Sequence, residues 1–493
     1  MAIGAQSVPM RWTAGPLDIA RRQKEKDFTA EMAEVLRKWQ DPSLLALVQG
    51  TPVNCLVVAW ASGLPADAEQ QQALKPLLES GRKAGLDFVG LIEEPADKAA
   101  AIAAARAAGL SAVAMESVPP GNAGIPVIPW GKSGEALWKA SSPILGVSDG
   151  FWPGVPQDKT PTGGPTNLPW VESNGALLSM ARALAPDKAV WMVFDPSQQV
   201  KLSTEGYLLA VADVAAYGGR WVISLDPQML AGLASQAAPA MDAWKRIAGA
   251  LAFFEQNKPV RTFEPTTRLA VISNFSGADR FLAEETLNLL PRLREPFRAI
   301  ARSQAAAASF DGLQGILYAD QEPPDAKLRQ KLIAFAKGGG TLFVRSKWPN
   351  PEGSPAPLSP AEAYLLFNVR SLGKGRLATA KEDDPDAYFV CADIQNILSH
   401  RGDVVRLYNG ASMNYYLHAS PKGGQGAIHL LNYSRRPGSD GVVLYVKTPY
   451  RSARFVSPEI ASPVALEWAP QKAGGAELSL PRFAVYGVVQ LES

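Results

Sequence analysis

Six carboxylates follow apolar runs in the first half of this 493-residue chain. They are Glu93, Glu116, Asp149, Glu172, Asp195 and Asp226. In a parallel α/β barrel the carboxyl ends of the strands form one rim, so acids at successive strand ends face a common space. Two carboxyl groups on such a rim, one protonated and one ionised, can supply general acid, general base or nucleophilic catalysis. Cleavage of a glycosidic bond is a typical example.

Aromatic side chains accompany these acids along the chain. Trp60 and Trp130 end apolar runs, and Trp152 and Trp170 lie in the loop rich in proline and glycine between 149 and 189. Indole faces suit the apolar face of a sugar ring, while nearby polar groups pair with its hydroxyls. We therefore expect substrate contacts from two sets: the aromatics Trp60, Trp130, Trp152 and Trp170, and the polar residues Glu93, Asn174 and Asp195.

The elements that must position these residues alternate regularly. Strand-like apolar runs occur at 53–60, 88–94, 111–117, 125–130, 143–149, 189–195 and 220–226. Helical patterns separate them, at 19–39, 65–87, 96–108, 133–140, 174–185, 203–217 and 239–256. Alternation with short connections is typical of parallel α/β structure, and continuous apolar strands indicate cover on both faces. The sequence predicts a (β/α)8 TIM-like barrel over 1–260, whose weak remaining strand is either 7–13 or 167–172.

The rest of the chain changes character twice. Residues 265–390 alternate between strands and helices, which predicts a flavodoxin-like α/β domain. From about 372 strand patterns dominate, the run AYFVCAD (387–393) among them. Turn residues at short spacing from 405 to 493 predict a C-terminal antiparallel β-sandwich.

Composition excludes several classes of function. With 49 basic and 47 acidic residues, the net charge of +2 offers no attraction for nucleic acid or an anionic membrane. No apolar run is long enough to span a bilayer. The two cysteines and three histidines lack metal-ligand spacing, so no metal or cofactor is expected. Loops rich in tryptophan, proline and glycine favour a periplasmic or extracellular protein whose signal peptide was removed, and a cytoplasmic location stays open.

The middle domain carries a family resemblance. The segment GILYADQEPPDAKLRQKLIAFAKGGGTLFVRSKW (315–348), with GKGRLATAKED and AIHLLNYS after it, resembles β-galactosidases that contain a trimerisation domain. That domain is similar to class I glutamine amidotransferases, although no nucleophilic cysteine or serine follows a strand here. The resemblance implies a glycosidase barrel and a homo-oligomer formed through the middle domain. The barrel departs from the family because no Asn-Glu pair occurs in 1–260.

Strand counting gives the acids their expected roles. In the resembled enzymes the acid/base carboxylate ends the fourth strand and the nucleophile ends the seventh. If 7–13 is the first strand, Glu116 is the acid/base and Glu172 is the nucleophile. Asp149 and Glu93 are then neighbours that bind substrate hydroxyls or tune the charge of the pair. If the register shifts by one strand, Asp149 and Asp195 become the better pair.

Each acid also has an ordinary structural interpretation. Glu172 precedes Ser173, the expected N-cap of helix 174–185, and an acid there favours the helix start. Asp195 and Asp226 each precede a proline, as turn residues often do. The sequence thus predicts a glycoside hydrolase-like protein that cleaves an oligosaccharide or polysaccharide fragment with two carboxylates. The alternative is a catalytically inactive barrel that binds glycans or scaffolds an assembly.

Overall fold

A computed structural model describes most of the chain. The described residues are 3–93, 97–117, 124–155, 171–257, 263–348, 364–399, 402–420, 422–437, 441–447, 450–472 and 474–493. They form two compact units, one of residues 1–152 and 187–258, the other of residues 153–186 and 259–493. This division cuts across the predicted first domain, because 153–186 belongs with the second unit.

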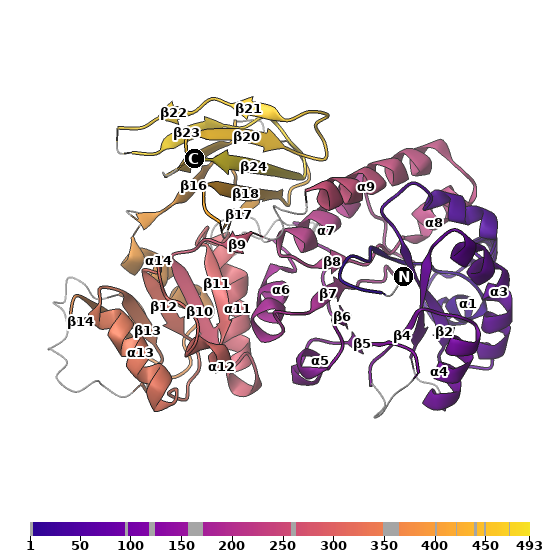
Figure 1. Cartoon of the computed structure of the whole chain (residues 1–493), viewed down its shortest axis with the longest axis horizontal. Coiled ribbons are helices and arrows are strands. Elements are labelled where there is room, and N and C mark those ends of the chain that lie inside the picture. The colour runs from indigo at the N-terminus through magenta and orange to yellow at the C-terminus, as the bar shows by residue number, and fades with distance from the viewer. Residues whose placement is uncertain are drawn as a thin grey trace. The chain divides into compact units, whose positions relative to one another are not determined.

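The first unit contains an eight-stranded parallel sheet in sequence order (Figure 1). Its strands are β1 (Pro9–Arg11), β2 (Cys55–Ala61), β3 (Asp87–Ile92), β4 (Ala112–Met115), β5 (Val127–Gly131), β6 (Ile144–Val147), β7 (Ala189–Met192) and β8 (Arg220–Trp221). The sheet closes because Arg11 N donates to Ile223 O at 2.8 Å and Ile223 N donates to Pro9 O at 3.1 Å. The predicted barrel is confirmed, and 7–13 supplies its first strand. Residue 172 forms only an isolated bridge with Gly154.

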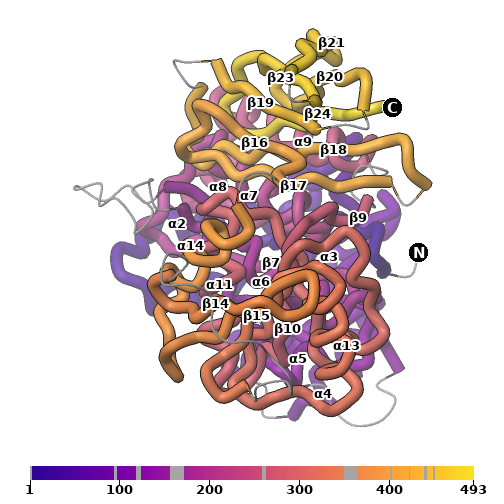
Figure 2. The backbone as a smooth tube through the Cα atoms, turned by 90° about the vertical axis from the view of Figure 1, so that its left-hand side faces the viewer, coloured from indigo at the N-terminus to yellow at the C-terminus, as the bar shows by residue number. Residues whose placement is uncertain are grey.

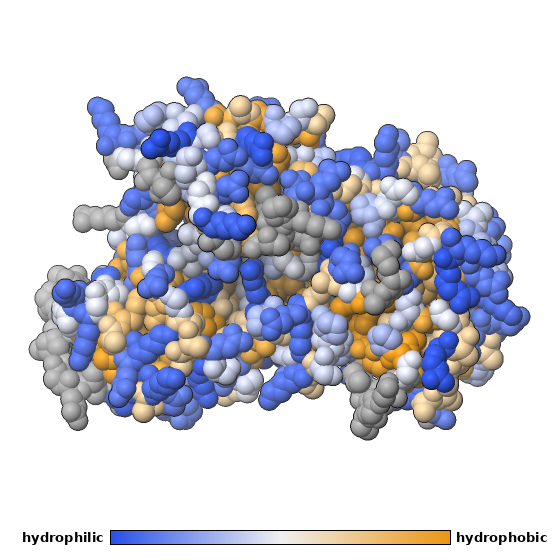
Figure 3. Space-filling view, in the orientation of Figure 1, coloured by the Kyte–Doolittle hydropathy of each residue, from blue (hydrophilic) through white to orange (hydrophobic). Residues whose placement is uncertain are grey.

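Helices cover the barrel strands. They are α1 (Pro16–Arg22), α2 (Ala30–Lys38), the 3-10 helix η1 (Pro42–Leu47), α3 (Asp67–Lys83), α4 (Lys98–Ala107), α5 (Glu135–Lys139), α7 (Thr204–Ala216), α8 (Pro227–Ala234) and α9 (Ala238–Gln256). The single helix expected at 19–39 is two helices, because Asp27 adopts a left-handed conformation (φ 68°) and Thr29 caps α2 by accepting from Met32 N. The outer face of α3 is polar, which Figure 3 shows as a hydrophilic surface on the right-hand rim.

The barrel interior is filled by residues of very unequal size. Ala112 and Ala114 face the same core as Trp130 and Trp191. At Gly146 of β6 an added Cβ would lie only 2.2 Å from the Trp130 ring, so no other residue fits there without movement. Small residues on some strands therefore make room for tryptophans on others, which is how a barrel of this size stays packed.

The second unit contains a six-stranded sheet in the order β11-β10-β12-β13-β15-β14 (Figure 1). Figure 2 shows its paired strands β14 and β15 next to each other. The strands are β10 (Leu269–Ser273), β11 (Phe297–Ala301), β12 (Gly315–Tyr318), β13 (Thr341–Val344), β14 (Phe367–Leu372) and β15 (Gly375–Ala380), and only β14 pairs antiparallel. The helices are η2 (Gly277–Asp279), α11 (Arg280–Arg292), α12 (Arg302–Ala305) and α13 (Ala326–Lys337). Within this sheet the second strand along the chain, β11, lies at the edge beside the first, β10, as the second strand does in flavodoxin-like sheets. Helix α6 (Gly175–Leu184), which links two barrel strands in sequence, packs against β11 and α11.

The strand expected at 387–393 is wrong. These residues begin α14 (Ala387–Leu398), which packs against α11. Asp386 caps the helix by accepting from Tyr388 N at 2.8 Å, and Val390, Ile394 and Ile397 bury one helical face. The continuous apolar run concealed a helical period because its other positions are apolar as well.

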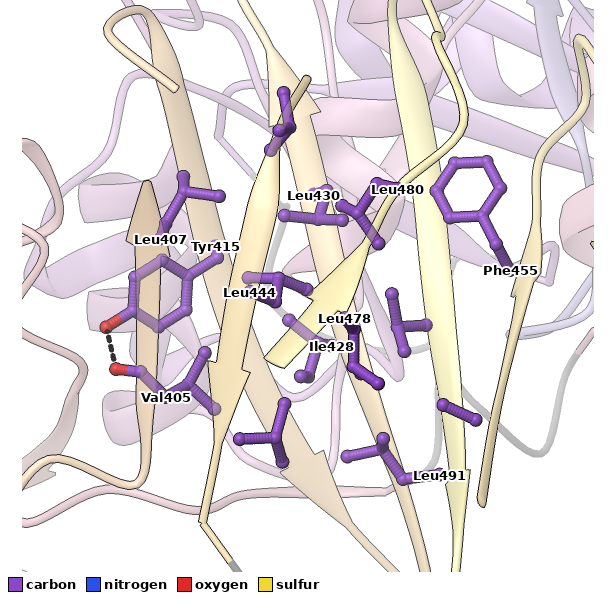
Figure 4. Packing of buried hydrophobic residues seen from close by; sticks show 14 of the residues in the cluster. Val405, Leu407, Tyr415, Ile428, Leu430, Leu444, Phe455, Leu478, Leu480 and Leu491 are labelled. Atoms are coloured by element: carbon purple, nitrogen blue, oxygen red, sulfur yellow. Dashed lines mark hydrogen bonds between the residues drawn. The ribbon is translucent and has the colours of Figure 1, made fainter. Parts of the chain in front are cut away.

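Two antiparallel sheets occupy the C-terminal part of the chain, where the sequence predicts a β-sandwich. One has the order β16-β19-β23-β22 and the other β21-β20-β24-β18-β17-β9. Their strands are β9 (Glu264–Pro265), β16 (Val405–Tyr408), β17 (Met413–Ala419), β18 (Gln425–Asn432), β19 (Val443–Val446), β20 (Ser452–Val456), β21 (Val464–Leu466), β22 (Ala469–Pro470), β23 (Ala476–Ser479) and β24 (Tyr486–Glu492). Leucines and valines from both sheets interdigitate between them, and the buried Tyr415 hydroxyl donates to Val405 O (Figure 4).

Candidate active site

A cavity of about 700 Å³ opens at the carboxyl ends of the barrel strands. Its apolar lining comes from strand ends that face inward: Ala59, Leu91, Met115, Trp130 and Val193. Its charged lining consists of Arg11, Asp18, Arg21, Lys24, Glu93, Glu116, Lys132 and Asp195. An apolar floor with a few charged groups around it is the usual construction of a small-molecule site.

The strand ends explain why the acids reach this cavity. Glu93 follows β3, Glu116 follows β4, and Asp195 comes three residues after the end of β7. The Glu116 side chain lies over Gly131 at the end of β5, where an added Cβ would be 3.3 Å from the Glu116 Cγ. Three of the predicted site acids therefore converge, as expected for one rim of a barrel.

Arg21 crosses the mouth of the barrel. Its Nη1 lies 3.6 Å from Glu93 Oε1 and 3.2 Å from Asp195 Oδ2. Strands β3 and β7 stand opposite each other in a closed ring of eight, so this guanidinium spans the opening. Asp195 has a second partner in Arg22, whose Nη2 lies 3.0 Å from Oδ1. Arg22 is buried and also donates to Pro196 O at 2.8 Å, so it holds Asp195 in place.

A buried polar pair supports the wall of the cavity. Asp18 pairs with Arg11 and accepts from Ala14 N at 2.8 Å. Arg11 in turn donates to Val57 O at 3.2 Å. Burial raises the pKa of the Asp18 carboxyl, an effect that Arg11 opposes and Asp195 reinforces. Both of its oxygens are engaged and its side chain is buried, so Asp18 positions α1 and is not available to a substrate.

Glu116 differs from the other cavity acids. Its carboxylate is exposed to the cavity, and among the described residues it has no hydrogen bond or ion pair. A general acid must reach the substrate directly, and a carboxyl group already held by arginines is less free to do so. Glu116 is therefore the best candidate for a proton donor here.

The structure places other predicted site residues elsewhere. Asp149 does not line the cavity, because its carboxylate accepts from Ser133 N at 2.9 Å and Ser133 Oγ at 2.6 Å and ties two loops together. Trp60 is buried on the outer side of β2, where its Nε1 donates to Ala101 O at 3.2 Å beneath α4. Its side chain cannot reach the cavity, so the substrate contact expected of it is wrong.

Trp152 also lies away from the cavity lining. Its ring packs edge-on against Phe194, Tyr207 and Trp221, with centroid distances of 5.8, 5.3 and 5.2 Å. Trp170 lies outside the described residues. Of the three predicted aromatics that the structure describes, Trp130 alone lines the cavity.

Glu172 and Asn174 belong to the second unit. Glu172 pairs its backbone with Gly154, and burial raises the pKa of its carboxyl while Arg292 opposes the shift. It does not end the seventh barrel strand, which is β7, so the strand count that made it the nucleophile is wrong. Asn174, rather than Ser173, is the N-cap residue of α6 and is buried. Asp226 caps α8 by accepting from Gln228 N at 2.9 Å, which confirms its turn interpretation.

Sequence reasoning missed the cations of the site. Arg11, Arg21, Arg22 and Lys24 follow or end the first strand, in the stretch RWTAGPLDIARRQK. The available signal was this cluster of arginines just after a strand end, on the rim where the acids were expected.

No group of histidine, cysteine and acidic residues suited to a metal ion occurs among the residues that the structure describes. None of the described helices is long and apolar enough to cross a membrane.

Comparison with known proteins gives a fold and no family. No protein-family model and no curated protein matches the chain. The α-L-fucosidase isoenzyme 2 from Paenibacillus thiaminolyticus is similar over 99% of this chain and 100% of its own, with a TM-score of 0.57 and 11% identity. β-Galactosidases from Rahnella sp. R3 and Bacillus circulans sp. alkalophilus give TM-scores of 0.42 and 0.41, at 11% and 9% identity. They cover 86% and 87% of this chain and 66% and 68% of their own. The likeness to the fucosidase shows that the fold is shared along the whole chain.

Proposed function

We propose that the protein is a glycoside hydrolase whose catalytic carboxylates are Glu116 and Asp195. The observation that carries the proposal is that both line one cavity, where Glu116 has no partner among the described residues and Asp195 is held between two arginines. They follow the fourth and seventh strands, the positions that carry acid/base and nucleophile in the β-galactosidases that the sequence resembles. The shared fold with an enzyme named as an α-L-fucosidase supports the same class of reaction.

Each carboxylate has a distinct role in the proposed reaction. Glu116, as the carboxylic acid, donates its proton to the glycosidic oxygen as the bond to the leaving group breaks. Asp195 faces the positive charge that develops on the sugar ring and forms a covalent bond to it or stabilises it until water attacks. Glu116 then takes the proton from that water and is restored. Trp130 provides an apolar surface beneath the sugar.

A catalytically inactive glycan-binding barrel is the second candidate. The observation that favours it is that Glu93 and Asp195 are both engaged by Arg21, so a sugar reaches them only if this arginine moves or the sugar lies above it. The missing Asn-Glu pair is consistent with this reading.

Hydrolysis of a panel of aryl glycosides and oligosaccharides separates the two candidates. We expect the wild-type protein to release product, and Glu116→Gln and Asp195→Asn each to lower kcat by about 100-fold or more. Glu69→Gln, on the exposed face of α3, is the matched control and should keep full activity. For an aryl glycoside with a good leaving group, Glu116→Gln should lower kcat less, because the departing oxygen needs less protonation.

The opposite results are equally informative. If the wild-type protein cleaves no member of the panel but binds a glycan, the hydrolase proposal fails and the binding barrel replaces it. If Glu172→Gln abolishes activity while Asp195→Asn does not, the assignment of the second carboxylate is wrong.

A further inference from the structure

We infer that the cavity takes a sugar carrying a negatively charged substituent, which Arg21 and Lys24 bind. The inference rests on the proposed function only in placing a sugar in this cavity. It concerns a recognition subsite, so it can be tested by binding, whether or not the sugar is cleaved.

The first support is the unused half of the Arg21 guanidinium. Both of its ion pairs, to Glu93 and to Asp195, use the same nitrogen, Nη1. Within the part of the chain that the structure describes, Arg21 makes no further hydrogen bond or ion pair. Its side chain is 41% exposed and lines the cavity, so Nε and Nη2 are accessible to a ligand. Two parallel N–H donors form the fork that binds carboxylate or sulfate oxygens.

The second support is a neighbouring lysine without a partner. Lys24 follows Arg21 in the tight turn after α1, where its backbone N donates to Arg21 O at 3.3 Å. Its side chain is exposed and lines the same cavity, and no described residue pairs with it. The guanidinium of Arg21 and the ammonium group of Lys24, within one turn of chain, form a compact site for an anion. A sugar that carries only neutral hydroxyls would not require two cations there.

The acids around the subsite set its limits. The buried Arg22 pairs with the other oxygen of Asp195. The negative charge of Asp195 is therefore shared between two arginines and does not by itself cancel the charge of Arg21. Glu93 has Arg21 as its ion-pair partner, and its side chain is 42% exposed. A bound anion would meet the carboxylates of Glu93 and Glu116 in the cavity, and Glu93 is the one that shares Arg21 with it. Removing the charge of Glu93 should therefore strengthen binding of an anion.

The substituent can be a uronic acid carboxylate or a sulfate ester, since both present oxygens to the fork. These two sources differ in geometry, a planar carboxylate matching a planar guanidinium more closely than a tetrahedral sulfate does. The experiment therefore includes both, each beside its neutral counterpart.

Isothermal titration calorimetry at low salt tests the inference directly. The probes are uronic acid oligosaccharides with their carboxyl-reduced counterparts, and sulfated oligosaccharides with their desulfated counterparts. We expect at least one charged member to bind more tightly than its neutral counterpart, and this preference to shrink as salt is raised. Arg21→Met should weaken the charged ligand by about 10- to 100-fold, while Arg21→Lys, which keeps the charge and loses the fork, should recover only part of the affinity.

Two further variants sharpen the test. Lys24→Met should weaken binding of the charged ligand by up to about 5-fold. The matched control is Lys26→Met, which replaces an exposed lysine outside the cavity lining. Glu93→Gln should strengthen binding of the charged ligand, because it removes an exposed carboxylate that competes with the ligand for Arg21. A purely structural role for Glu93 would not produce a gain restricted to charged ligands.

Several results would overturn the inference. Equal affinity for charged and neutral members, binding of neutral members alone, or no binding of any charged member at about 10 mM would each do so. A preference for charged ligands that survives Arg21→Met would also contradict it. None of these results depends on catalysis, so a protein that binds uronates and cleaves nothing would keep this subsite and lose the hydrolase proposal.

Discussion

The barrel mouth and a buried junction in the second unit use the same chemical groups in opposite ways. At the mouth, Arg21 is 41% exposed and shares one nitrogen between two acids. In the second unit, Arg268 is 6% exposed and places Nε and Nη2 on the two oxygens of Glu295 at 2.8 and 2.6 Å. Its Nη1 lies 3.0 Å from Asp403. At the junction every nitrogen of Arg268 has an acceptor, whereas at the mouth Arg21 uses only Nη1 in its ion pairs.

This difference separates a structural ion pair from a binding group. Water exclusion makes the Arg268 cluster expensive to break, because the Glu295 carboxylate would stay buried without this cation. Exposure makes the Arg21 pairs weak contributors to stability, since solvent screens them. A ligand can replace water at Arg21 at little cost, and nothing comparable is open at Arg268.

Removing the buried arginine should have the largest effect on stability. Arg268→Met removes the cation beside the buried Glu295, while Asp403 keeps Arg406, and we expect a loss of about 3–5 kcal/mol in the free energy of unfolding. Arg21→Met should cost less than about 1 kcal/mol. Urea denaturation of both variants measures the contrast, and equal losses would mean that the two arginines do not differ in the way described.

The packing beneath the cavity should be the next most sensitive feature. Gly146→Ala places a methyl group against the Trp130 ring, and we expect a loss of about 1–3 kcal/mol together with weaker ligand binding. Gly249→Ala on α9, where nothing lies within 4 Å of the added methyl, is the matched control and should not destabilise. Denaturation and calorimetry on the same samples measure both effects. Unchanged binding in Gly146→Ala would argue against Trp130 as part of the site.

The stability of the second unit should depend on pH through the buried His418. His418 is buried in β17 with its ring 4.8 Å from that of His429, and burial, aided by His429 and Arg182, lowers its pKa well below 6.5. The unfolded chain therefore binds a proton near pH 6.5 that the folded chain does not. Stability should be fully present above about pH 6.5 and fall on acidification, with a slope approaching about 1.4 kcal/mol per pH unit.

A substitution isolates this contribution. His418→Gln keeps a polar side chain and removes the titrating group, so the unfolding free energy of this variant should change less between pH 7 and pH 5 than that of the wild-type protein. Denaturant titrations at several pH values measure the difference. An identical pH dependence in both proteins would show that His418 is not the group that titrates.

The sequence alone determined the local pattern of the barrel. Apolar runs ending in acids predicted the strands that became β3, β4 and β7, and the carboxyl-end rule placed Glu93, Glu116 and Asp195 at one cavity. These inferences succeeded because strand length, helix period and chain direction are properties of short segments. Strand order followed from the same information, since each short connection brings the next strand alongside.

Only the tertiary structure decided which side chains meet. Trp60 and Trp130 both end strands that are covered on both faces, so their sequences do not reveal that one points outward to α4 and the other into the cavity. The pairing of Arg21 with acids from opposite strands depends on residues far apart in sequence, brought together by closure of the ring. Likewise Glu172 follows an apolar segment but joins the second unit, because the backbone partners of a strand lie outside the segment itself.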